Sequence, residues 1–259
     1  MENINPIFII QPVVTIAIGA ALMLYWYKKR HFHTNVWLYS LAAYAIAIGL
    51  KYAVQIPTVG LVSGAGEVAL GVYYGLQTVV FEVGLAYVVA SYAVKRSKMD
   101  RRDAEAYGSG LAFWENVAFI SVLSLINLVA YYIILSGSGS IADLTYNQLT
   151  AAAPSLFASN SEALGLVGMG ILERISSALI HIAWGYLCLM AVIYRKKILF
   201  FIALPMGLID FLVPFANYSP LLFEVVVFGL AALSVFVAWY STKRLCIQLV
   251  EPEQTHKLG

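Results

Sequence analysis

The chain has little charge for its length. Only 12% of its 259 residues are Asp, Glu, Lys or Arg, whereas a soluble domain carries about 25%. The mean hydropathy is +0.80. The formal net charge of +2 gives no indication of nucleic-acid binding, because the basic residues form short clusters between apolar segments. We therefore expect nearly all of the chain to lie in a lipid bilayer.

Cysteine is also scarce. Cys188 and Cys246 are the two cysteines of the chain, and they form no C-x-x-C pair. Neither a disulfide framework nor a thiolate metal site is therefore indicated. The N-terminal stretch "MENINPIF" has neither a basic region nor a cleavage site, so we predict no removable signal peptide.

Long apolar runs dominate what remains. A membrane-spanning helix needs about 20 apolar residues, and seven runs reach that scale: 6–27, 35–55, 67–94, 104–136, 162–194, 198–216 and 220–242. A shorter interfacial helix is expected around 142–153. No internal repeat is evident, so we predict an all-α polytopic membrane helix bundle forming one integral membrane domain over residues 1–259.

The basic residues fix a predicted topology. Thirteen of the sixteen Lys and Arg lie in four clusters, "YKKRHFH", "KRSKMDRRD", "RKK" and "TKR", which occupy every second connection. The alternate connections, 56–66, 137–161 and 217–219, contain neither Lys nor Arg. Because cytoplasmic loops are enriched in Lys and Arg, the N-terminus is predicted outside and the C-terminus in the cytoplasm. The expected location is the plasma membrane of a prokaryotic cell.

Several ionisable residues nevertheless fall inside the spans. Each costs about 2.5–3.5 kcal/mol at a helix centre, and the group would cost on the order of 15 kcal/mol if it faced lipid. They must therefore face the bundle interior and pair with one another. They are Lys51, Glu82, Glu115, Glu173, Arg174, His181 and Asp210.

Four of these residues are predicted at a similar depth. Glu82, Glu115, His181 and Asp210 each lie twelve to fifteen residues from the end of a different span. A carboxylate beside an imidazole in a cavity can deprotonate water as a general base. The same set could hold a divalent metal such as zinc through one His and two carboxylates, with His181, Glu115 and Asp210 as candidate ligands.

Three stretches resemble a known family. "EAYGSGLAFWENVAF" (105–119), "ERISSALIHIAWGYL" (173–187) and "LPMGLIDFLVP" (204–214) are similar in order and spacing to motifs of the PrsW-type and YhfC-type polytopic membrane proteases. These belong to the wider group with the CAAX-processing glutamate-dependent enzymes. The similarity covers about residues 75–215.

The resemblance implies an intramembrane endopeptidase that uses a buried Glu and His to activate water. It places Glu82 on the family's first acidic motif, Glu115 and Asn116 on the second, His181 on the third and Asp210 on the last. Glu82, Glu115 and His181 are thus the predicted catalytic residues. The expected partners are membrane lipid and a transmembrane or membrane-proximal peptide substrate or partner protein.

The sequence departs from the family pattern at two positions. The first motif has a single Glu at residue 82 where the family has two, and Met206 occupies the position of a family His. Either Glu115 has taken over a catalytic role, or the chain is a divergent, catalytically silent relative that serves as a membrane scaffold or partner-binding subunit.

Each residue also has a purely structural reading. Glu173 and Arg174 would form a structural pair, and Lys51 would be the counter-ion of Glu82 or Asp210. His181 would bond Glu173 or Ser177. Asp210 would satisfy backbone groups freed by the neighbouring prolines.

Two further functions were weighed against the protease. A proton-coupled transporter also uses mid-membrane acids, but the chain has no inverted repeat. A retinal receptor needs a lysine in the last span, and residues 220–242 contain none.

Overall fold

The computed structural model describes residues 3–30, 33–216 and 218–247. In this part of the chain, seven helices are long and apolar enough to cross a membrane, which confirms the predicted all-α polytopic bundle. The spans are Pro6–Lys29, Asn35–Ser63, Glu67–Ser97, Arg101–Leu135, Asn160–Ile193, Lys197–Phe215 and Pro220–Cys246.

The spans are built from α-helices interrupted by irregular turns. The α-helices are α1 (Ile10–Arg30), α2 (Asn35–Ser63), α3 (Glu67–Gln77), α4 (Gly84–Ser97), α5 (Arg101–Phe113), α6 (Val122–Leu135), α7 (Ser140–Ala152), α8 (Asn160–Ile193), α9 (Lys197–Ala203) and α10 (Pro220–Thr242). The 3₁₀-helical segments are η1 (Pro6–Ile9), η4 (Pro154–Phe157) and η5 (Leu204–Phe215), and the π-helical segments are η2 (Thr78–Val83), η3 (Trp114–Ser121) and η6 (Lys243–Ile247). The interfacial helix expected around 142–153 corresponds to α7.

The third, fourth and sixth spans depart from regular α-helical geometry, which the sequence analysis did not predict. The third and fourth predicted spans each contain a π-helical insertion, η2 and η3, near their middle. Such insertions are frequent at functional sites. The sixth span is α-helical for only seven residues and continues as the 3₁₀ segment η5, which has Pro205 in its first turn and Pro214 inside.

The second span is longer than predicted. It runs to Ser63, whereas the predicted span ended at residue 55, and it contains Pro57. Proline removes one backbone hydrogen bond, but transmembrane helices tolerate it where neighbouring groups compensate.

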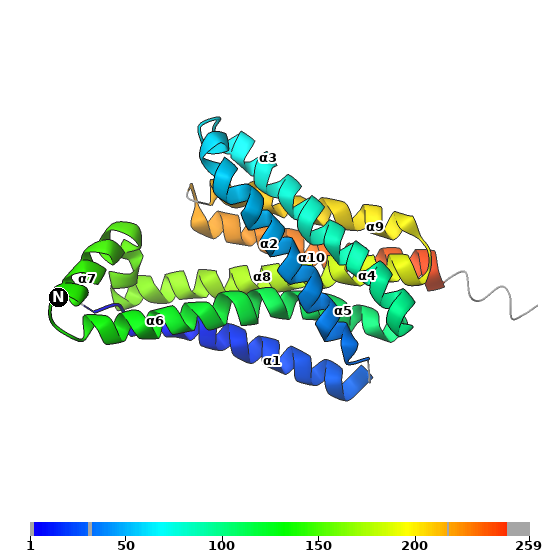
Figure 1. Ribbon diagram of the computed structural model, residues 1–259, viewed down its shortest axis with the longest axis horizontal. Coiled ribbons are helices and arrows are strands. Elements are labelled where there is room, and N and C mark those ends of the chain that lie inside the picture. The colour runs from blue at the N-terminus through cyan, green and yellow to red at the C-terminus, as the bar shows by residue number, and fades with distance from the viewer. Residues whose placement is uncertain (1–2, 31–32, 217, 248–259) are drawn as a thin grey trace, which may run out of the picture.

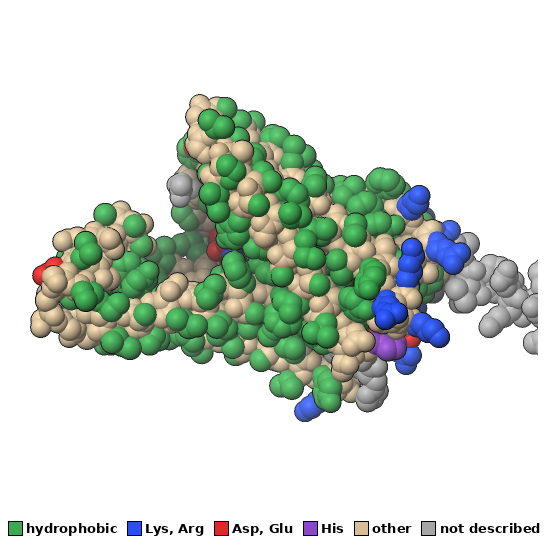
Figure 2. All heavy atoms as spheres, viewed as in Figure 1, with side chains coloured by type: hydrophobic (Ala, Val, Ile, Leu, Met, Phe, Trp, Pro, Cys, Tyr) green, Lys and Arg blue, Asp and Glu red, His purple; other side chains and the backbone are tan. Residues whose placement is uncertain are grey.

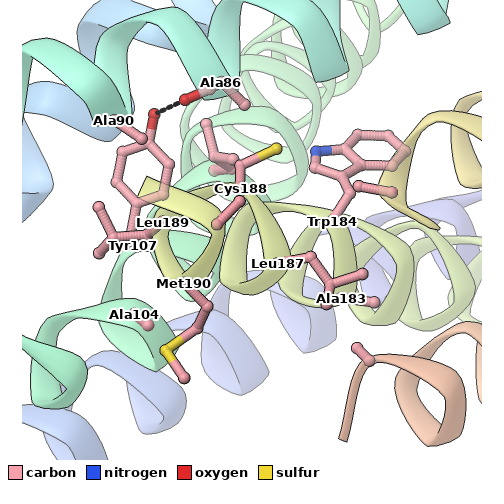
Figure 3. Packing of buried hydrophobic residues seen from close by; sticks show 14 of the residues in the cluster. Ala86, Ala90, Ala104, Tyr107, Ala183, Trp184, Leu187, Cys188, Leu189 and Met190 are labelled. Carbon is pink, nitrogen blue, oxygen red and sulfur yellow. Dashed lines mark hydrogen bonds between the residues drawn. The ribbon is translucent and has the colours of Figure 1, made fainter. Parts of the chain in front are cut away.

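The main core lies around α8, which crosses α5 closely. Gly108 on α5 and Gly185 on α8 face each other, and a Cβ on Gly185 would come within 2.6 Å of the Cα of Gly108. Small residues allow helix backbones in membranes to approach in this way. Around this crossing, Figure 3 shows Trp184 within the packed cluster and Tyr107 donating a 2.8 Å hydrogen bond to the carbonyl of Ala86.

The molecule divides into two groups of helices toward one end. In Figure 1 the α2–α3 hairpin leans away from α6 and α8, and α7 closes the ends of α6 and α8. A second, smaller hydrophobic cluster, which includes Phe8, Leu128 and Leu149, packs η1, α6 and α7 together there. Figure 2 shows a notch between the two groups, while the Lys and Arg side chains gather at the opposite end.

Candidate functional site

Three helices bring ionisable side chains to one point. Glu82 lies on η2, Glu115 on η3 and His181 on α8. Nε2 of His181 lies 3.3 Å from Oε2 of Glu82 and also contacts Oε2 of Glu115. One oxygen or nitrogen atom from each residue falls within 4.8 Å of the others, so the three side chains could hold a metal ion.

The orientation of His181 is set by its own helix. Nδ1 lies 2.8 Å from the backbone carbonyl of Ser177, one turn earlier. A carbonyl oxygen can only accept, so Nδ1 carries a proton. Nε2 then presents a lone pair when the ring is neutral, and donates to the carboxylates of Glu82 and Glu115 when the ring is protonated. The ring also packs against Trp184 at 4.2 Å between centroids. The Ser177 hydroxyl donates to Oε1 of Glu115 at 3.2 Å, so Ser177 contacts both His181 and Glu115.

A lysine network adjoins this cluster. Nζ of Lys51 on α2 donates to Oε1 of Glu82 at 2.6 Å, Oγ1 of Thr78 at 2.8 Å and Oδ2 of Asp210 at 3.0 Å. Thr78 in turn donates to Oδ2 of Asp210 at 2.5 Å. Lys51 is therefore the counter-ion of both Glu82 and Asp210, and Asp210 bonds to side chains rather than to the backbone near its prolines.

Arg174 forms a separate pair nearer the start of α8, seven residues before His181. Its guanidinium bonds Glu173 and donates to Oδ1 of Asn116 at 3.3 Å. Asn116 anchors itself to the carbonyl of Ala112 at 3.1 Å. These contacts place Arg174 as a link between α8 and η3, beside Glu115 but outside the three-residue cluster.

A cavity of about 430 Å³ is lined by the cluster and by the charged residues of both networks. Its walls come from α2, α3, η2, η3, α8, η5 and α10. Apart from tyrosines, its ionisable lining residues are Lys51, Glu82, Glu115, Glu173, Arg174, His181 and Asp210. Four carboxylates and two cations leave a net charge of −2 when the imidazole is neutral. In a medium of low dielectric, such a charge requires compensation.

The cluster fits a divalent metal on these grounds. When the imidazole is neutral, three acceptor atoms, Nε2 of His181 and one carboxylate oxygen each from Glu82 and Glu115, face one another, and their lone pairs repel unless a proton or a metal ion lies between them. A cation between them would remove the repulsion, and a divalent one would also balance the −2 charge. Imidazole nitrogen and carboxylate oxygen are common zinc ligands.

The predicted residues form three groups in the structure: the three-residue cluster, the network around Lys51, and the contacts around Arg174. Glu82, Glu115 and His181 meet, as their similar depth suggested. Asp210, which the sequence offered as a metal ligand, is instead bonded to Lys51 and Thr78 and does not belong to the three-residue metal cluster. Thr78 was not recognised from the sequence, although its place four residues before Glu82 puts both on one helix face.

Fold and site together define a polytopic membrane protein with a buried Glu–Glu–His centre. The chain matches the family described as YhfC intramembrane metalloprotease over residues 13–227. It therefore belongs to the YhfC intramembrane metalloprotease family. No curated protein matches it, and no solved structure does.

Proposed function

We propose that the protein hydrolyses a peptide bond of a membrane-embedded segment at a metal centre formed by Glu82, Glu115 and His181. The observation that carries this proposal is the convergence of one ligand atom from each of the three residues within 4.8 Å, in a cavity whose carboxylates outnumber its Lys and Arg side chains by four to two. Membership of an intramembrane metalloprotease family supports the same chemistry.

The residues would divide the work as follows. Nε2 of His181, Oε2 of Glu82 and Oε2 of Glu115 would hold the metal, which leaves Oε1 of Glu115 for proton transfer. When bound, a divalent cation polarises the scissile carbonyl and activates water. Glu115 is the better proton acceptor of the two carboxylates. The charge of Glu82 is neutralised by the Lys51 ammonium, whereas Oε1 of Glu115 accepts a hydrogen bond from the neutral Ser177 hydroxyl, which is a weaker interaction. Glu115 takes a proton from the attacking water and passes it to the nitrogen of the departing amine, as the C–O bond forms and the C–N bond breaks.

A His181→Ala variant tests the proposal. The full chain is purified in detergent, stripped with a chelator and reloaded with Zn²⁺, and bound metal is counted by mass spectrometry. We expect about one zinc per wild-type chain and almost none in the variant. Wild-type protein in liposomes should cleave a fluorophore-labelled transmembrane peptide only after reloading. A wild-type chain that binds no zinc would remove the basis for the mechanism.

A catalytically silent partner-binding role is the alternative. The single Glu at residue 82 and Met206 in place of a family His favour it. It predicts that the zinc-loaded chain forms a stable complex with a membrane protein without cleaving it. We also infer kinship with the PrsW-type and CAAX-processing group from the motif order, and a divergent position within it from these same departures.

The orientation in the membrane is proposed from the charge distribution. Figure 2 shows Lys and Arg gathered at one end of the molecule, which we assign to the cytoplasmic side of a prokaryotic plasma membrane. The C-terminal residues 248–259 lie outside the described residues. A Ser138→Cys variant should then react with an impermeant maleimide in intact cells, and an Arg96→Cys variant only after lysis. The reverse pattern would invert the topology; Cys188 and Cys246 are buried.

A further inference from the structure

Lys51 uses all of its hydrogen-bonding capacity next to the proposed metal centre. An ammonium group has three donors, and the three acceptors are Oε1 of Glu82, Oγ1 of Thr78 and Oδ2 of Asp210, at 2.6, 2.8 and 3.0 Å. To reach a substrate carbonyl, Lys51 would have to give up one of these bonds. Its hydrogen bonds therefore suit a residue that holds Glu82, Thr78 and Asp210 in place, an arrangement called the clamp below, and not one that polarises a substrate carbonyl.

The clamp joins segments that regular helix geometry does not fix. Glu82 and Thr78 lie on the π-helical turn η2, and Asp210 lies on the 3₁₀ segment η5. Lys51 extends from a regular helix, α2, and binds both. The 2.5 Å bond from Thr78 to Asp210 closes the network. Close packing supports it, because a Cβ on Gly207 of η5 would lie 3.0 Å from the backbone nitrogen of Val79 on η2.

The clamp also divides the two oxygens of Glu82. Oε1 is occupied by Lys51, whereas Oε2 faces Nε2 of His181. We propose that Lys51 is a positioning residue that holds Glu82 so that only Oε2 is presented to the metal. This inference rests on the proposed function, since it concerns the way in which one ligand of that centre is oriented.

Charge and geometry make opposite predictions for Lys51. If Lys51 acted only through its positive charge, replacing it with Met would leave the cavity more negative and tighten binding of a cation. If Lys51 positions Glu82, the same replacement frees Oε1, the carboxylate rotates and binding weakens. Substituting Arg keeps the charge but cannot reproduce three donors converging from one nitrogen.

The experiment measures zinc affinity in Lys51→Met and Lys51→Arg. The full chain is purified in detergent, and Zn²⁺ is titrated against a chromophoric chelator. Loss of a group that orients a ligand typically costs about 10–100-fold in affinity, and we expect a loss of this size in both variants. Lys196→Met, the same chemical change at an exposed position, is the control and should bind zinc as wild type does.

Each outcome bears on the clamp. Tighter binding by Lys51→Met with unchanged binding by Lys51→Arg would show an effect of charge alone and would overturn it. Unchanged affinity in both variants would overturn it too, while leaving the metal centre intact. A wild-type chain without zinc would overturn the metal centre and the clamp together. If the Lys51 variants do not fold, Thr78→Val decides: it keeps Lys51 but removes the bridge to Asp210, and it should weaken zinc binding.

Discussion

Replacing Glu115 with Gln tests the centre most directly. The change keeps the size of the side chain but removes one negative charge from a group whose ligand atoms lie within 4.8 Å of one another. A carboxylate and a divalent cation about 4 Å apart interact by about 8 kcal/mol at an effective dielectric constant of 20. Each 1.4 kcal/mol is a factor of about ten in affinity. The Gln carbonyl oxygen that remains is a neutral ligand and recovers part of this energy, so we expect zinc affinity to fall by at least about a thousandfold.

The assay is a chelator competition on the detergent-purified chain, with Glu162→Gln as the matched control. Glu162 is exposed in the first turn of α8, so its replacement removes the same charge without touching the cavity and should leave zinc affinity unchanged. Peptide cleavage should be lost in Glu115→Gln even at saturating zinc, because the proton acceptor is gone. Wild-type zinc affinity in Glu115→Gln would refute the metal centre.

Two other predictions concern packing and capping. In Gly108→Val the new side chain would meet the backbone of Ile182, so we expect the free energy of unfolding to fall by about 1–3 kcal/mol and the melting temperature measured by fluorimetry to fall with it. Gly165→Ala, which has open space around it, is the control and should melt no lower than wild type. Equal melting temperatures of the two variants would contradict the close helix crossing. At the start of α5, the Arg102 guanidinium bonds Asp100 at 2.7 Å and holds the pKa of that capping carboxyl below its ordinary value. A lowered pKa means that the stabilisation is present at neutral pH and lost as pH falls through the native pKa. In Arg102→Ala this loss should begin at higher pH, as a carboxyl NMR titration of Asp100 would detect; an unchanged titration would show that Arg102 has no such effect.

Much of the candidate site could be predicted because the depth of a residue in the membrane follows from its position along its own helix. A helix rises about 1.5 Å per residue, so counting from the basic clusters places Glu82, Glu115 and His181 at one level. The cost of a charge in lipid then requires partners at that level. Depth alone does not distinguish Asp210 from Glu82, and the sequence prediction placed Asp210 rather than Glu82 among the candidate metal ligands, whereas the structure groups Glu82 with Glu115 and His181.

Which of these side chains contact one another depends on how each helix is rotated about its axis, and the sequence does not give this rotation. Lys51 contacts both Glu82 and Asp210, an arrangement that the sequence left open between the two. The π-helical turns η2 and η3 and the 3₁₀ segment η5 change the direction in which each side chain points, and hydropathy does not record them. Thr78 was missed for the same reason, since a threonine in an apolar run gives no signal until its neighbours are known.

The sequence by itself determined that seven helices are long and apolar enough to cross a membrane and that Glu82, Glu115, His181 and Asp210 have a similar depth, because the bilayer imposes length and polarity on each segment separately. Only the tertiary structure decided that Glu82, Glu115 and His181 form the centre while Asp210 and Thr78 bind Lys51. That choice depends on helix rotation and on irregular turns, which packing between distant segments sets.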